Sequence, residues 1–122
     1  MFKEKLTEGV THFNHREFWE SHESWEELWL EAGTDLHQYL QGLIQLAAAY
    51  HHIKRGTTRG AVRLFDAALK RLEAFPVVHC GVDRSAAVAA AIRDRESLMR
   101  GEATGEFPTL DIVGEVPPLD EW

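Results

Sequence analysis

The segment from Phe18 to Trp29, FWESHESWEELW, constrains the fold more than any other part of the chain, because it concentrates three of the four tryptophans. Read as a helix at about 100° per residue, with His22 at zero, it places Phe18 at about −40° and Trp29 at about −20°. Trp19 and Trp25 fall at about +60° and −60° by the same rule. A helix with so wide an aromatic stripe buries it against other elements, so the segment predicts a core of packed helices.

Two ionisable residues interrupt this aromatic stripe. Glu26 lies at about +40° from His22, so both side chains are predicted to point inward from the middle of the aromatic face. A break of this kind in an apolar pattern is either functional or compensated by bonding partners. The opposite, solvated side is predicted to carry Glu20, Ser24, Glu27 and Glu31. The predicted functional cluster comprises His22, Glu23, Glu26, Gln41, Gln45, Trp19, Trp25 and Trp29.

Length and composition favour one soluble, all-α domain. The chain has 122 residues, of which 44% are apolar and 27% charged, and Ala, Leu, Glu and Arg outnumber the β-branched residues. It has no run long enough to span a membrane and no apolar signal region near Met1. A single cysteine, Cys80, excludes an internal disulfide and suits a reducing compartment. We therefore predict a cytoplasmic protein that does not associate with membranes.

The net charge of −7 is unevenly distributed along the chain. Residues 1–53 and 101–122 are acidic, whereas residues 54–100 are basic. An acidic protein is a poor general binder of nucleic acid, because phosphate affinity comes from Lys and Arg. The basic block is typical of a solvated turn, but it is also compatible with a weak anion-binding site, a contact with the acidic tail or a contact between subunits of a homodimer. The residues of this weak site are Lys54, Arg55, Arg59 and Arg63.

Hydrophobic periodicity predicts five helices in stacked antiparallel hairpins. They are expected at 3–13, from Arg16 or Glu17 to Gly33, and at 35–55, 58–75 and 84–100, with a loop at 76–82. Candidate caps are Thr34 or Asp35, Thr57 and Asp83. The spacing Ser21-x3-Trp25-x2-Leu28 recurs as Ala61-x3-Phe65-x2-Ala68, which is similar to tetratricopeptide hairpins. Helix 35–55 is apolar over most of its surface, so it is expected at the centre, with its glutamines beside the His22–Glu26 pair.

The last residues of the chain differ from the rest. We predict a helical bundle domain at residues 1–101 and an extended acidic tail at 102–122, which holds three prolines. The tail could lie along a groove through its apolar residues, or it could be disordered. Those apolar residues are Phe107, Leu110, Ile112, Val113 and Trp122.

Three segments together resemble domain-of-unknown-function family 309, a small all-helical prokaryotic family. They run from Phe13-Asn14 to Trp29, then from Gln41 to Ala47, and then from Gly56 through Gly60-Ala61 to Leu64. The family pattern has Asn where this chain has Thr57. The resemblance implies a compact helical bundle and implies no activity.

The residues leave several chemistries open. His22-Glu23-x-x-Glu26 resembles the zinc-protease motif His-Glu-x-x-His with Glu26 in place of the second His. A third ligand would have to come from elsewhere, with His12, His15, His51 and His52 as candidates by type only, so we assign no metal site and no cofactor. The pair is equally compatible with a buried structural network or with an aromatic pocket for a ligand.

We therefore carry two functional hypotheses. The first is a non-catalytic binding or interaction module that takes an unknown protein partner or small ligand. The second is a small metal-assisted or acid–base hydrolase centred on His22, Glu23 and Glu26.

Overall fold

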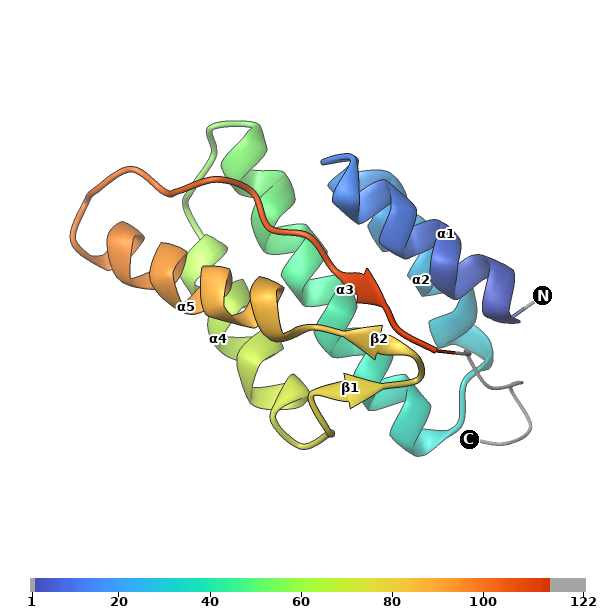
Figure 1. The fold of residues 1–122 in the computed structure, drawn as a ribbon. Helices are drawn as coiled ribbons and strands as arrows, with labels where there is room; N and C mark the ends of the chain where they lie inside the picture. The colour runs from blue at the N-terminus through green and yellow to red at the C-terminus, as the bar shows by residue number, and fades with distance from the viewer. Residues whose placement is uncertain (1, 115–122) are drawn as a thin grey trace.

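Five helices form most of the chain in the computed structural model, which describes residues 2–114 (Figure 1). They are α1 (Phe2–Asn14), α2 (Phe18–Glu31), α3 (Thr34–Lys54), α4 (Ala61–Leu72) and α5 (Ser85–Met99). Consecutive helices pack against one another, and α3 lies between α2 and α4. The predicted all-α bundle with α3 at its centre is confirmed, since Tyr39, Leu43, Ala47 and Tyr50 of α3 are fully buried. No helix within residues 2–114 is both long and apolar enough to cross a membrane.

A small antiparallel sheet replaces part of the loop predicted at 76–82. Its strands are β1 (Val78–His79), β2 (Val82–Asp83) and β3 (Asp111–Ile112), in that spatial order. Cys80 and Gly81 form the β1–β2 turn with φ of 57° and 75°. β3 comes from the C-terminal part of the chain and lies between β2 and α1 in Figure 1.

The buried face of α2 differs from the predicted one. Ser21 and Ser24 are buried, whereas the Glu26 side chain is 48% exposed and Trp19 is 48% exposed. The inward face is therefore rotated away from His22 and Glu26 toward α1, and it consists of Phe18, Ser21, Ser24, Trp25 and Leu28.

Hydrogen bonds to α1 explain this rotation. The Ser21 hydroxyl donates to the Gly9 carbonyl at 2.8 Å, and the Trp25 indole N–H donates to the Leu6 carbonyl at 3.2 Å. The Ser24 hydroxyl donates to a Glu8 carboxylate oxygen at 3.1 Å. Because the serine side chains are small, α1 can approach α2 closely. Because their hydroxyl groups are hydrogen-bonded, burying them costs little free energy.

Two predicted caps are wrong and one is close to the observed arrangement. Gly33, not Thr34 or Asp35, precedes α3 as the N-cap. α4 begins after Gly60, whose φ is 87°, and ends at Leu72, so Thr57 is not its N-cap. The Thr57 hydroxyl instead donates to the His52 carbonyl at 3.3 Å. Asp83 does accept the backbone N–H of Ser85, at 2.9 Å, where α5 begins.

Residues 102–114, here called the C-terminal segment, run back across the bundle between α1 and α5 (Figure 1). Leu110 is fully buried, and the Phe107 ring lies 5.3 Å from the Phe18 ring, whereas Ile112 and Val113 are exposed. The prediction for Trp122 lies outside the described residues.

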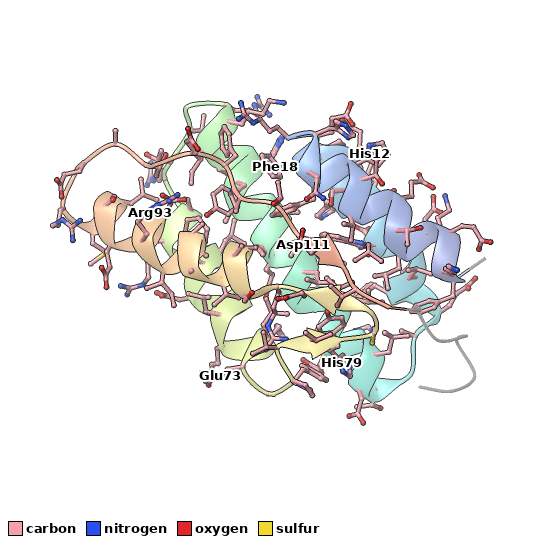
Figure 2. All side chains as sticks on the ribbon, in the orientation of Figure 1. His12, Phe18, Glu73, His79, Arg93 and Asp111 are labelled. Atoms are coloured by element: carbon pink, nitrogen blue, oxygen red, sulfur yellow. The ribbon has the colours of Figure 1, made fainter. Side chains whose placement is uncertain are left out.

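A buried carboxylate, Asp94, ties α5, α3 and the C-terminal segment together. It accepts hydrogen bonds from the Tyr50 hydroxyl at 2.7 Å, from the Gly105 N–H at 2.9 Å and from the neighbouring Arg93 guanidinium. Arg93, labelled in Figure 2, also donates to the Glu106 carbonyl at 2.9 Å.

Candidate functional site

The outer face of α2 carries a shallow groove of about 320 Å³. Its lining residues recur after three, four, seven, eight and eleven positions, so they form one stripe along the helix. They are Trp19, His22, Glu23, Glu26, Glu27 and Leu30. The stripe includes two large apolar side chains that remain exposed, Trp19 and Leu30, the latter at 70%.

His22 is held at one wall of the groove by its neighbours. Its ring stacks on the Trp19 indole, with centroids 4.9 Å apart and planes 8° from parallel. Its Nε2 lies 3.4 Å from a Glu26 carboxylate oxygen. The predicted His–Glu pair therefore forms, but it faces the groove at the surface of α2 instead of the interior.

The seam between α2 and α3 contains two enclosed ring nitrogens without partners. Nδ1 of His22 and Nε1 of Trp29 have no hydrogen-bond partner within residues 2–114. Trp29 packs against His37 of α3 at 4.2 Å between ring centroids, and Trp19 packs against His51 at 5.4 Å. The seam is therefore aromatic, with polar edges held away from bulk water.

Burial lowers the pKa of His51, and the positive charges of Arg55 and His52 lower it further. His51 is thereby biased toward the neutral form beside Trp19.

Four members of the predicted cluster do not line the groove: Trp29 lies in the seam described above, and the other three lie elsewhere. Trp25 is buried against α1, on the other side of α2 from the groove. Gln45 accepts a hydrogen bond from Nε of Arg71 at 3.1 Å, so it faces α4 instead of α2. Gln41 is half-buried, and its side chain has no hydrogen bond within the described residues. Of the predicted cluster, Trp19, His22, Glu23 and Glu26 line the groove.

A known protein family matches the part of the chain that forms the groove. The family model described as Domain of unknown function (DUF309) matches residues 6–64. The chain belongs to the DUF309 family. The matched residues include all of α2 and α3 and therefore the whole groove of this DUF309 protein. No curated protein matches it.

Two residues outside the predicted cluster also line the groove of this DUF309 protein. Glu27 was expected on the solvated side and is exposed; it also borders the groove, and its carboxylate pairs with Lys5 at 2.9 Å. Leu30 was not singled out. Helical spacing could have identified Leu30, because it lies seven residues after Glu23 and four after Glu26 on the same stripe.

The predicted basic cluster lies in and after the exposed α3–α4 turn of the DUF309 protein. Lys54 donates to the Arg16 carbonyl at 2.6 Å, which ties this turn to the start of α2. Arg55, Arg59 and Arg63 are exposed. Their role as an anion site stays a prediction.

The other histidines considered as metal ligands are mostly engaged near the ends of their helices. His12 contacts Glu17 at 3.0 Å, His15 contacts the Thr11 carbonyl at 2.8 Å, and His52 contacts the Thr57 hydroxyl at 3.3 Å (His12 is labelled in Figure 2). Within residues 2–114 no three His, Cys, Asp or Glu side chains are grouped so that they could hold a metal ion.

Proposed function

We propose that this DUF309 protein is a cytoplasmic binding module whose α2 groove takes a basic, partly apolar segment of a partner protein. The observation that carries the proposal is the exposed Trp19 in a groove lined by three glutamates and by no Lys or Arg. Exposed aromatic and acidic groups in one concavity are the complement of an Arg or Lys side chain with its aliphatic stem.

The charges of the groove favour a cation. Glu27 is paired with Lys5 and Glu26 lies beside His22, but Glu23 has no ion pair within residues 2–114. Residues 1–53, which contain the groove, carry nine acidic and three basic side chains. A segment bearing Arg would therefore be attracted at long range and then held by a carboxylate.

The apolar side chains favour a protein segment over a small cation. Trp19 and Leu30 lie near opposite ends of the stripe, eleven residues apart along α2. Burying both requires an occupant that extends along the helix. The aromatic ring adds attraction for a guanidinium, of about 0.5–1 kcal/mol at an exposed site.

Calorimetric titration with a synthetic peptide of alternating Arg and Leu tests this proposal. We expect saturable binding, and no binding of the same peptide with Glu in place of Arg. Glu23→Gln and Trp19→Ala are each expected to weaken binding about fivefold to tenfold. Glu31→Gln is the matched control, because it removes one exposed charge of α2 outside the groove lining. If Glu31→Gln and Glu23→Gln weaken peptide binding equally, the effect comes from net charge alone and the proposal is overturned.

One observation favours a second candidate, an acid–base or metal-assisted hydrolase centred on His22, Glu23 and Glu26. Nε2 of His22 and a carboxylate oxygen of Glu26 lie 3.4 Å apart in a groove open to solvent, and a His–Glu pair that closes to hydrogen-bond distance when a substrate binds can transfer a proton. Elemental analysis of protein purified without added metal tests the metal-assisted form of this candidate. Stoichiometric metal that is lost in His22→Ala would favour the hydrolase.

A further inference from the structure

A second concavity, of about 550 Å³, lies between α4 and α5 beside the start of the β1–β2 hairpin. Small-molecule sites in proteins typically have volumes of about 300–1,000 Å³ and mostly apolar walls with a few polar groups. Glu73, labelled in Figure 2, lies just past the end of α4 and borders this cavity. Most of the wall is apolar and includes Leu69, Leu72, Phe75, Val77, Val88 and Ile92.

One buried cation, Arg84, borders this apolar space. Arg84 is only 5% exposed, and no carboxylate within residues 2–114 forms an ion pair with it. Its guanidinium donates to the carbonyl oxygens of Leu72 at 2.6 Å and Phe75 at 2.7 Å, and to that of Pro76. Carbonyl dipoles thus hold the charge in place, and within residues 2–114 no carboxylate lies at ion-pair distance from it.

The donors of Arg84 are not all used. A guanidinium has five N–H groups, and the three bonds above come from Nη1 and Nη2 alone. Nε has no acceptor within the described residues, and it is not among the enclosed nitrogens without partners. Arg84 therefore lines the apolar cavity with an N–H group that has no acceptor within residues 2–114.

We propose that the cavity binds a medium-chain aliphatic monocarboxylate. Its hydrocarbon chain packs between α4 and α5, and its carboxylate accepts a hydrogen bond from Arg84. Part of the driving force is apolar, because Val77 and Ile92 line the cavity, are each about half exposed and become covered. The charge-assisted bond to Arg84 supplies the rest. Glu73 at the rim disfavours a ligand with further negative charges. This site lies on different helices from the α2 groove and does not depend on the function proposed for it.

Titrations with decanoate, decanol and decylammonium below their micelle concentrations test the proposal. Decanoate is expected to bind at least about tenfold more tightly than decanol, because only the anion is held by the buried cation. Decylammonium is expected not to saturate. Glu73→Gln is expected to tighten decanoate binding about twofold, because it removes a like charge at the rim.

A matched pair of α5 variants locates the site without disturbing Arg84, which also holds the end of α4. Ala89 lines the cavity and is exposed, so Ala89→Trp fills the space and is expected to abolish decanoate binding. Ala86 is exposed on the same helix but does not line the cavity, so Ala86→Trp is expected to bind like the wild type. Equal affinity for decanol and decanoate, or unchanged binding in Ala89→Trp, overturns the proposal. So does sedimentation in which Ala89→Trp alone converts a ligand-free dimer to a monomer, since the cavity is then a subunit interface.

Discussion

Asn14, the last residue of α1, pairs with both backbone groups of Leu110 as a neighbouring β-strand would. Its Nδ2 donates to the Leu110 carbonyl at 2.8 Å, and its Oδ1 accepts the Leu110 N–H at 2.7 Å. The two residues are ninety-six positions apart, so this amide closes the bundle over the aromatic core beneath the C-terminal segment.

Asn14→Ala should therefore loosen the C-terminal segment. It removes two partly buried hydrogen bonds, and the Leu110 backbone groups lose their partners, so the free energy of unfolding is expected to fall by about 2 kcal/mol. Urea denaturation measures this. Thr109→Ala, an exposed change in the same segment, is the control and is expected to stay within about 0.5 kcal/mol of the wild type. Equal losses in the two variants contradict the pairing.

Gly9→Ala is expected to destabilise the protein, although alanine is the better helix former by about 1 kcal/mol. A Cβ on Gly9 would lie 2.1 Å from Nε1 of Trp25, which is fixed by its own hydrogen bond to Leu6. Overpacking of this kind costs about 1–3 kcal/mol. A Cβ on Gly33 meets nothing within 4 Å, so Gly33→Ala is expected to change stability by less than about 1 kcal/mol. Thermal unfolding of both variants compares them.

The same close approach explains what sequence reasoning missed on α2. Helical spacing correctly placed Phe18 and Trp25 toward the core, and the family resemblance correctly indicated a helical bundle. Ser21 was not assigned to the core and Ser24 was read as solvated, because a hydropathy pattern counts a serine as polar. Their acceptors lie on α1, and packing between helices leaves no local signal in the sequence.

Contacts between distant residues account for the other differences. Gln45 was expected beside His22, but Arg71 of α4 binds its side chain. The hairpin at Val78–Asp83 was read as a loop because its strands have two residues each, and β2 is completed by Ile112 from the C-terminal segment. The Arg84 cavity likewise combines α4, α5 and the hairpin, so none of these segments indicates it alone.

Acid should weaken the α2–α3 seam through His51. Burial lowers its pKa in the folded state below the ordinary value of 6.5, so the unfolded chain binds the proton more readily. The contribution of His51 to stability is therefore complete above pH 6.5 and is lost as pH falls through the folded-state pKa. His51→Gln is expected to flatten the decline in unfolding free energy between about pH 7 and pH 5. If the unfolding free energies of the variant and the wild type depend on pH identically, His51 does not cause the loss of stability in acid.

Arg84→Met is expected to be the most destabilising of these changes, at about 3 kcal/mol, because the carbonyl group of Leu72 at the end of α4 and those of Phe75 and Pro76 after it lose their donor at once. Arg95→Met is the matched control. Arg95 pairs with Asp66 between α5 and α4, but both side chains are partly exposed, and such ion pairs contribute about 0–1 kcal/mol. Denaturant titration of the two variants at equal ionic strength separates them. If Arg84→Met lowers the free energy of unfolding no more than Arg95→Met does, Arg84 does not hold the end of α4, and its contacts with the carbonyl groups contribute little to stability.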